Sequence, residues 1–191
     1  MDLITALRDF RPWNEQEARD ATEILRRLEH GEELYHRENT AAHLTASAWV
    51  VSPDRRQVLM AYHSLYDSWS WLGGHADGDR DLLAVAMREV REESGVLAYP
   101  VSRQIYSLEI LPVFGHQKRG QYVSSHLHLN VTFLLEADPS APLRSCPGEN
   151  SQVAWFSPEN AIAASTEVWM REQIYEKLHA KLALFPSLSS H

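Results

Sequence analysis

Residues 73–96, GGHADGDRDLLAVAMREVREESGV, carry the clearest signal in this chain. A glycine pair opens the stretch and a single glycine closes it. Three glutamates lie between them within about one turn of a predicted helix: Glu89, Glu92 and Glu93. Carboxylates spaced i, i+3 and i+4 share one helix face, where they repel one another unless a cation lies among them. Because hard divalent cations prefer oxygen ligands, the spacing predicts a helix that binds a divalent metal.

The apolar residues of this stretch indicate which glutamates are buried. At roughly 100° per residue, the apolar side chains between Leu82 and Val90 fill one arc of the helix. Glu89 and Glu93 fall inside this arc and Glu92 falls at its edge. Burying a carboxylate is costly unless it is paired or binds a metal. The alternative is a surface helix in another register, and the pattern favours the buried arrangement.

The segment from Gly74 to Val96 resembles the Nudix box of the Nudix (MutT-like) hydrolase family. The pattern of that box is Gly, five residues, Glu, seven residues, and then Arg-Glu-apolar-x-Glu-Glu-x-Gly-apolar. Gly74 takes the first position, and the residues from Arg88 to Val96 fill the last part without a gap. The resemblance implies an α/β fold, a Nudix α/β/α sandwich with a mixed sheet.

One position departs from the family pattern, because Arg80 stands where the box has its first glutamate. In the family that glutamate looks mainly structural, since it helps to hold the box arginine, which is Arg88 here. A cation near a helix start opposes the helix dipole. Three aspartates can offset its charge or engage Arg88 instead: Asp77, Asp79 and Asp81. Asp79 is the expected N-cap of the box helix. We expect Arg80 at this position to lower the stability of the site more than the rate of the reaction.

The resemblance also implies the metal ligands. Glu89, Glu92 and Glu93 are expected to bind Mg²⁺ or Mn²⁺, and the backbone carbonyl of Gly74 can complete the metal shell. A glycine pair lets the backbone pass close to a metal or a phosphate, because no Cβ interferes. Glycine pairs alone are usually turns, so the surrounding box carries this prediction.

The catalytic residues implied by the resemblance are Arg88, Glu89, Glu92 and Glu149. Either Glu89 or Glu149 would accept the proton of the attacking water. Glu149 lies six residues before Trp155, which is similar to the place where some family members, such as MutT, hold an extra loop glutamate. An ordinary solvated loop carboxylate would give the same pattern.

Four further side chains are candidates for binding substrate: Trp71, His75, His126 and His128. His126, His128 and Asn130 alternate along one predicted strand and therefore share a sheet face. They could contact phosphate or metal, although a half-exposed strand would look the same. The chain also resembles a Nudix subgroup that carries a similar His-x-His segment, with motifs resembling residues 43–47 and 73–75. Trp71 can stack on a base or fill the core.

Length and composition are those of an ordinary globular protein. The chain has 191 residues and a net charge of −8, which argues against non-specific binding to nucleic acid or to an anionic membrane. Its single cysteine, Cys146, excludes an internal disulfide. No targeting segment and no apolar run of about 18 residues is evident. We expect a cytoplasmic protein whose partner is a small nucleotide-type molecule.

The chain divides into an N-terminal helical extension, residues 1–38, and a Nudix domain, residues 39–191. In the extension, Asn14-Glu15-Gln16-Glu17 has the pattern of a capping box before apolar residues at helical spacing. The extension can pack as an extra layer, form a lid or make a homodimer contact. Its apolar stripe favours a helix docked on the same domain.

Other patterns predict the elements on both sides of the box. A hairpin is expected around Pro53-Asp54-Arg55, between strands at 46–51 and 57–62. Ser157-Pro158-Glu159 is a helix-start signal. Further periodic segments predict strands at 103–113, 121–136 and 153–157 and a closing helix at 167–182.

The resemblance implies a metal-dependent pyrophosphohydrolase that cleaves the P–O–P linkage of a nucleoside diphosphate joined to a group X. Two alternatives remain. A catalytically weak Nudix domain could serve as a ligand sensor or interaction module, which only Arg80 favours. An isomerase similar to isopentenyl-diphosphate isomerase would use an active-site cysteine, and Cys146 lies in a late loop instead. The identity of X is not indicated.

Overall fold

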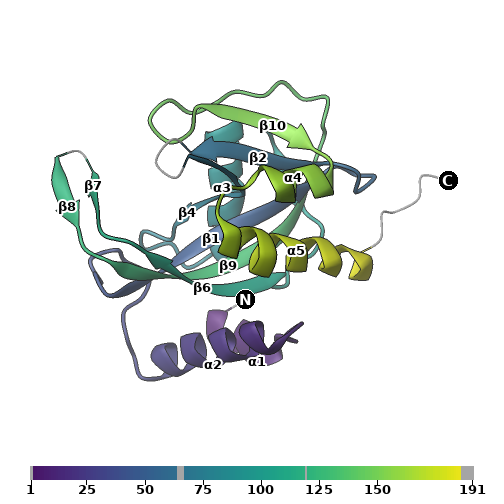
Figure 1. Ribbon diagram of the computed structural model, residues 1–191. Coiled ribbons are helices and arrows are strands. Elements are labelled where there is room, and N and C mark those ends of the chain that lie inside the picture. Colours follow the sequence, from purple (N-terminus) through teal and green to yellow (C-terminus); the bar gives the residue numbers. More distant parts are fainter. Residues whose placement is uncertain (1, 64–66, 119, 186–191) are drawn as a thin grey trace.

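A computed structural model describes residues 2–63, 67–118 and 120–185 of the chain. A mixed β-sheet forms the middle layer, and helices cover both of its faces (Figure 1). The arrangement confirms the predicted α/β class with a mixed sheet. No helix in the described ranges is long and apolar enough to cross a membrane.

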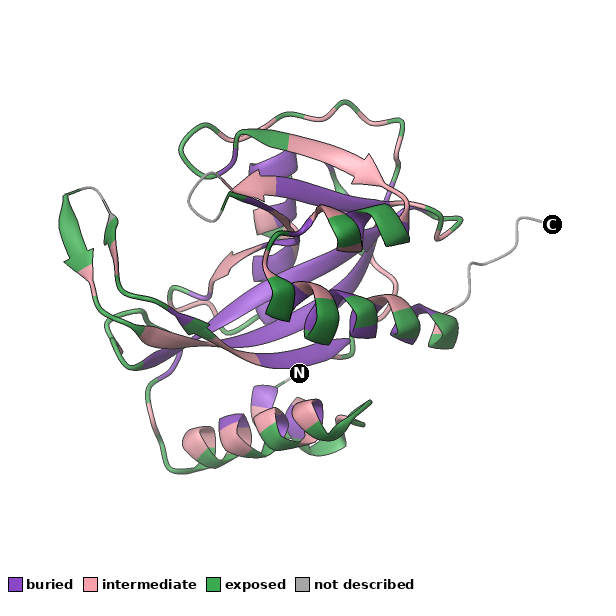
Figure 2. Ribbon diagram, in the orientation of Figure 1, coloured by how far each residue is buried: buried purple, intermediate pink, exposed green. Residues whose placement is uncertain are grey.

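Two long strands form the centre of the sheet, β1 (Ala42–Val51) and β9 (His126–Ala137). They run parallel, with the register Ala42↔Leu127 at one end and Val51↔Glu136 at the other. Every residue of β1 is buried, because both faces of the sheet are covered (Figure 2). A strand that is buried along its whole length is typical of the interior of a layered fold.

The sheet order is β10-β2-β1-β9-β5, with three further strands attached. β2 (Val58–His63) pairs with β1 around a turn at Arg55 (φ 63°), as the predicted hairpin requires. The outer strands are β3 (Ser68–Ser70) on β2, β4 (Leu72–His75) on β1, β5 (Ala98–Pro100) and β6 (Ser107–Val113) on β9, and β10 (Gln152–Phe156) on β2.

The predicted strand at 121–136 is divided in the structure. Its first part, β8 (Gln121–Val123), pairs with β7 (His116–Lys118) in a separate ribbon that extends from the sheet (Figure 1). The main sheet resumes only at His126. At the junction the hydroxyl of Ser125 accepts a hydrogen bond from the backbone N–H of Gly115 at 2.8 Å, so the chain there makes side-chain contacts instead of a ladder.

The box helix is α3 (Leu82–Ser94). Its N-cap is Asp81, whose carboxylate accepts the N–H of Ala84 at 3.1 Å, so the prediction of Asp79 as the N-cap is wrong. Asp79 lies in the preceding turn and instead accepts the N–H of Asp81 at 3.0 Å. The helix ends at Gly95, whose φ of 76° favours glycine.

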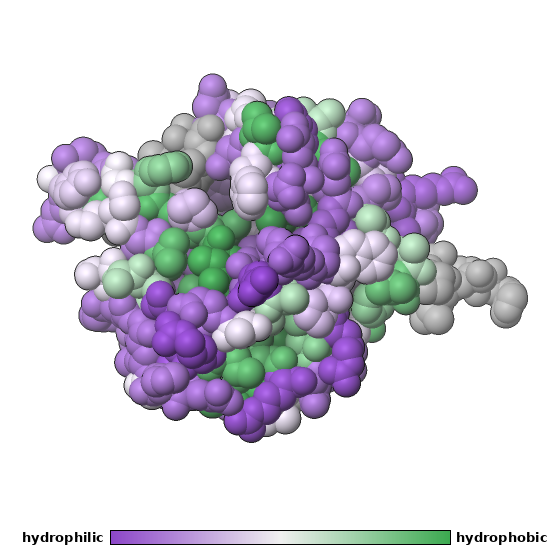
Figure 3. Space-filling model, turned by 60° about the horizontal axis from the view of Figure 1, so that its bottom comes forward, coloured by the Kyte–Doolittle hydropathy of each residue, from purple (hydrophilic) through white to green (hydrophobic). Residues whose placement is uncertain are grey.

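The N-terminal extension contains two helices, α1 (Leu3–Asp9) and α2 (Glu15–Glu29). The predicted cap is confirmed, because the side chain of Asn14 accepts the N–H of Glu17 at 3.0 Å. Helix does not continue to residue 38, because Gly31 adopts a φ of 74° directly after the last turn. On this side of the molecule the surface is largely hydrophilic, with apolar patches between the polar groups (Figure 3).

Side chains of α2 lie against the free edge of β6. The amide of Gln16 donates to the carbonyl of Leu108 at 2.9 Å, and the carboxylate of Asp20 accepts the N–H of Ile110 at 2.9 Å. Exposed strand edges are templates for unwanted pairing, and covering them is one way in which proteins prevent it. The extension therefore satisfies backbone groups of the central sheet.

Buried charges tie α2 to the end of the chain. Lys181 donates to the Glu17 carboxylate at 2.7 Å, and Lys177 lies 3.0 Å from the Glu109 carboxylate and 3.4 Å from that of Glu17. All four side chains are buried. Each charge thus has an opposite charge in place of water, which buried ions require.

The C-terminal segment packs against the sheet beside α2. After α4 (Pro158–Ala164), which begins at the predicted N-cap Ser157, a helical run extends to Leu184. This run was predicted as one α-helix, and it consists of a π-helical part (Met170–Tyr175), α5 (Glu176–Lys181) and a short 3₁₀ turn (Leu182–Leu184).

Candidate active site

The carboxylate of Glu89 lies against Gly74 in β4. A Cβ atom at Gly74 would overlap the Glu89 carboxylate, and a Cβ at Gly73 would overlap the backbone of β1. Gly74 therefore lets the carboxylate of α3 approach β4, and Gly73 lets β4 approach β1. The predicted approach of this backbone to a metal or a phosphate stays a prediction.

Glu93 is the most buried acidic residue of α3, with 3% of its surface exposed. It accepts a hydrogen bond from the backbone N–H of Gly73, whereas its Oε2 has no hydrogen-bond partner among the described residues. Burial raises the pKa of Glu93 well above its usual value, and the charges of Glu89, Glu149 and Glu92 raise it further. A buried oxygen of this kind is suited to a cation.

Glu89 is partly buried and Glu92 is exposed. Burial raises the pKa of Glu89, the neighbouring charge of Arg88 opposes that rise, and the charges of Glu92 and Glu149 add to it. The helical positions therefore agree with the sequence: Glu93 and Glu89 point inward and Glu92 lies at the rim. The four glutamates together form a concentration of negative charge at one end of α3.

Glu149 reaches this group although it lies in a distant loop. Asn150 holds the loop in place, because its amide donates to the carbonyl of Glu93 at 2.9 Å and accepts the N–H of Cys146 at 3.0 Å. Asn150 is buried. The charge of Glu149 acts on both Glu89 and Glu93, and its catalytic role stays a prediction. Sequence analysis missed Asn150, for which a loop sequence gives no periodic signal.

Arg88 is held by an aspartate instead of the family glutamate. Its guanidinium lies 3.3 Å from the Asp79 carboxylate and 3.6 Å from that of Glu89. Arg80 turns away from this pair, with its guanidinium 4.6 Å from the centre of the Tyr35 ring. Asp79 thus holds Arg88, which is the role that the family glutamate would have at position 80.

Trp71 is a core residue. Its side chain is 7% exposed and packs edge-on against Tyr175, with 5.6 Å between the ring centres. The Tyr175 hydroxyl accepts the backbone N–H of Trp71 at 3.3 Å. Two roles were considered for Trp71, stacking on a base and filling the core, and the structure supports the second. Trp71 has no part in the function proposed for this protein.

Four histidines gather at the end of the sheet where β1, β4 and β9 meet. The predicted residues His75, His126 and His128 surround His43, whose ring lies 5.1 Å, 4.8 Å and 5.1 Å from theirs, centre to centre. Burial lowers the pKa of His43, and it lowers the pKa of His128 to about 2. Sequence analysis did not list His43 as a site residue, although it quoted the motif that begins there.

A helix that presents inward-facing glutamates to a glycine pair on a mixed sheet is the arrangement that a Nudix box predicts. The model of the NUDIX domain family matches residues 41–178. The chain therefore belongs to the Nudix family. It is a Nudix hydrolase, an enzyme class that acts on phosphorus-containing anhydrides.

Solved structures show the same fold at low sequence identity. A NUDIX-family hydrolase from Clostridium perfringens is 21% identical, with a TM-score of 0.50 over 74% of this chain and 97% of that one. An Ap4A hydrolase from C. elegans is 16% identical, with a TM-score of 0.50 over 74% and 96%. A MutT protein from Methanosarcina mazei Go1 is 17% identical, with a TM-score of 0.50 over 75% and 96%. No curated protein sequence matches the chain.

Proposed function

We propose that this protein is a metal-dependent pyrophosphohydrolase that cleaves the P–O–P linkage of a nucleoside diphosphate joined to a group X. One observation carries the proposal: the buried oxygen of Glu93, which has no hydrogen-bond partner in the described part of the chain, lies in a group of four glutamates beside a glycine pair. Such crowding opposes folding unless a cation offsets it. A protein has a reason to keep crowded glutamates if the cation that they bind takes part in the reaction.

The donor set fits a hard divalent ion, Mg²⁺ or Mn²⁺. Glu89, Glu92 and Glu93 would hold it, together with the carbonyl of Gly74, because such ions prefer carboxylate and carbonyl oxygens. When bound, the metal would neutralise the diphosphate and lower the pKa of a water molecule.

The protein's own residues would position and deprotonate this water. Glu89 is the first candidate for the general base, because burial and its acidic neighbours raise its pKa and so strengthen it as a proton acceptor. Glu149 is the second, since the charge of Glu149 acts on both Glu89 and Glu93. Arg88, fixed by Asp79, would orient the Glu89 carboxylate.

The histidines at the end of the sheet would lie beside the substrate. His75 directly follows Gly74 in β4, and successive side chains of a strand face opposite sides, so His75 would contact a part of the substrate that extends past the glycine pair. His126 and His128 extend the same surface from β9. A neutral imidazole can donate one hydrogen bond to a phosphate oxygen.

The substrate is a small molecule, and a panel of candidate substrates would identify the group X. The panel contains ADP-ribose, NAD(H), nucleotide sugars, nucleoside triphosphates and dinucleoside polyphosphates, because one similar fold is that of an Ap4A hydrolase. We further propose that the enzyme acts in the cytoplasm, with no nucleic acid or membrane as a partner, in keeping with its net charge of −8. A homodimer contact remains a proposed role for the N-terminal extension.

The test is the loss of substrate with Mg²⁺ or Mn²⁺ present, compared between the natural enzyme and Glu93→Gln. We expect cleavage that needs the metal and falls by at least about 100-fold in the variant, as removal of a group that stabilises the transition state typically does. Full activity in both Glu92→Gln and Glu93→Gln would remove the metal assignment. If nothing in the panel is cleaved although Mg²⁺ stabilises the fold, the sensor alternative is supported.

A further inference from the structure

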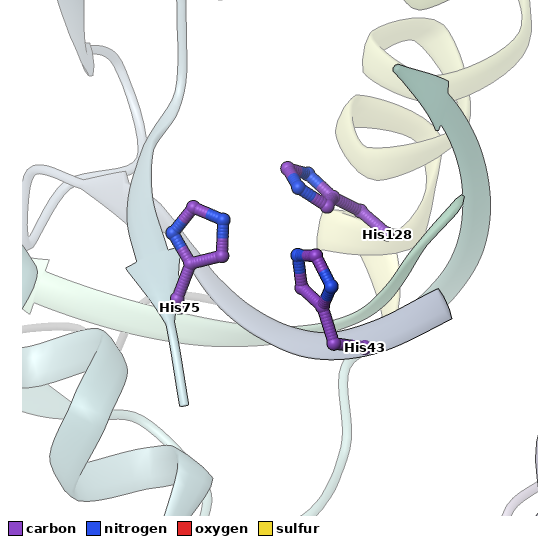
Figure 4. A group of neighbouring side chains, drawn as sticks. All are labelled: His43, His75 and His128. Carbon is purple, nitrogen blue, oxygen red and sulfur yellow. The ribbon is translucent and has the colours of Figure 1, made fainter. Parts of the chain in front are cut away.

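Three histidines from three different strands point toward one another (Figure 4). They are His43 on β1, His75 on β4 and His128 on β9, and one ring nitrogen of each lies within 4.8 Å of the others. His43 is paired with His128 in the parallel register, and His75 is paired with Thr45, two residues further along β1. Among the described residues this is the one group of three metal-ligating side chains that lie so close together.

The ring of His43 is prepared to act as a ligand. It is 4% exposed, and its Nδ1 lies 3.0 Å from the backbone carbonyl of Asn39. In the neutral ring the proton then lies on Nδ1, and the lone pair lies on Nε2. That Nε2 is buried without a hydrogen-bond partner among the described residues. Metal-binding histidines characteristically donate their other ring N–H to a carbonyl in this way.

A fourth histidine extends the group. The Nε2 atoms of His126 and His128 are 3.2 Å apart, and the Nδ1 of His126 lies 2.8 Å from the carbonyl of Ser124. Two imidazole nitrogens bound to one tetrahedral Zn²⁺ lie roughly 3.3 Å apart, given Zn–N bonds of about 2.0–2.1 Å. The separation in this structure is already that of two ligands of one ion.

We propose that His43, His75 and His128 form a site for a transition-metal ion such as Zn²⁺, with His126 available as a fourth ligand. Imidazole nitrogens suit Zn²⁺, Cu²⁺, Ni²⁺ and Fe²⁺, whereas Mg²⁺ prefers oxygen ligands. The protein would therefore bind two kinds of metal, one on nitrogen and one on carboxylates. Gly74 and His75 are consecutive residues of β4, so the two sites would lie on opposite faces of the strand.

The surroundings of the histidines are compatible with a cation. Arg37 is a permanent positive charge that acts on both His43 and His128. Its guanidinium is already paired with the carboxylate of Asp77. The arrangement favours a metal at Nε2 of His43, because its lone pair can bind a cation but cannot donate a hydrogen bond to an anion.

The experiment measures the binding of Co²⁺ and Zn²⁺ to the full chain after chelator treatment, with Mg²⁺ in excess to occupy the carboxylates. We expect about one equivalent to remain after dialysis, and Co²⁺ to give the visible absorption of a four-coordinate nitrogen site. His75→Gln and His128→Gln should each weaken binding by more than about 100-fold, since even the loss of an outer-shell partner costs 10–100-fold. His30→Gln is the matched control, because His30 is exposed at the end of α2, and it should bind as the natural protein does.

Three results would overturn the proposal: no retained Co²⁺ or Zn²⁺, equal retention in the histidine variants, or loss of binding in Glu93→Gln instead. The third result would place the metal on the carboxylates. X-ray absorption of the Zn²⁺-loaded natural protein decides the question even where a variant fails to fold. Scattering from at least three imidazoles supports the site, and a shell of oxygens alone contradicts it.

Discussion

The carboxylate of Glu89 occupies the space that a side chain at residue 74 would fill. This relationship joins β4 to the glutamates of α3, and it explains why the strand has a glycine at position 74. A backbone without a Cβ lets the acidic group approach the strand, where the carbonyl of residue 74 is a further proposed ligand of the cation.

Gly74→Ala should therefore damage activity more than stability. The new methyl group would displace the Glu89 carboxylate, which is the far end of a flexible side chain and can move. A displacement of about 1 Å in a catalytic group can lower the rate by about 100-fold, and we expect that fall in kcat/KM. Gly31→Ala is the control. It lies at positive φ far from the site, so it should lose about 1 kcal/mol of stability and keep its kinetics. Equal kinetics in the two variants would contradict the argument.

Glu93→Gln should stabilise the metal-free protein while it inactivates the enzyme. The pKa of Glu93 is raised in the fold, so ionising this carboxyl above its unfolded pKa destabilises the folded state. The free energy of unfolding of the natural protein should therefore fall, relative to the variant, as the pH rises from about 4.5. Urea unfolding with chelator at about pH 5 and about pH 8 measures this difference.

Glu92→Gln is the matched control for that experiment, because Glu92 is exposed on the same helix. Its stability should change by less than about 0.5 kcal/mol at either pH, as is usual for surface substitutions. A pH-independent difference between Glu93→Gln and the natural protein would show that Glu93 is not held as a destabilised carboxylate.

Asn150→Ala should act through Glu149. Asn150 fixes the loop to the carbonyl of Glu93, and without it Glu149 is no longer held beside the box glutamates. We expect kcat to fall about 10-fold, and the double variant with Glu149→Gln to fall no further than the more severe single variant, because residues that act together are not additive. If the loss of kcat in the double variant equals the product of the two single losses, Asn150 has a purely structural role.

Arg80→Glu should change turnover by less than about 10-fold, because Asp79 already holds Arg88. Asp79→Ala should reduce kcat more than Arg80→Glu alters it. A rise in turnover of several orders of magnitude on restoring the glutamate would mean that the natural protein is a weak or non-hydrolytic member of its family.

We propose that the extension, residues 1–38, folds together with the Nudix domain, residues 39–191. Glu17→Ala would leave Lys181 without its buried partner and Lys177 with Glu109 alone, and breaking such a network typically costs about 3–5 kcal/mol. Glu15→Ala, exposed on the same helix, should cost less than about 0.5 kcal/mol. Chemical unfolding monitored by two probes measures both, and separate transitions for the extension and the domain would contradict a single unit.

The sequence predicted the box helix because helical periodicity reports directly which side chains face inward. Glu93 lies at an inward position of that helix, and it is buried in the structure. Local signals were equally reliable at Asn14 and Ser157, where a side-chain cap depends on residues only three apart.

Contacts between residues that are far apart in the sequence could not be predicted from it. The parallel register of β1 with β9 brings His43 beside His128, which no local pattern encodes. The buried contacts of Glu17 depend on residues 90 and 164 positions away, and Asn150 works through a single bond to Glu93 across 57 positions. The N-cap of α3 was misplaced by two residues because several aspartates precede the helix and the sequence does not distinguish among them.

The most direct test of the central proposal is the cleavage of the substrate panel by the natural enzyme and by Glu93→Gln, each with Mg²⁺ and with chelator. We predict release of the two phosphate-bearing products only with metal and only from the natural enzyme, while both proteins remain folded. Cleavage that persists at the same rate in Glu93→Gln, or without any divalent metal, would contradict the assignment of these glutamates as the centre of the reaction.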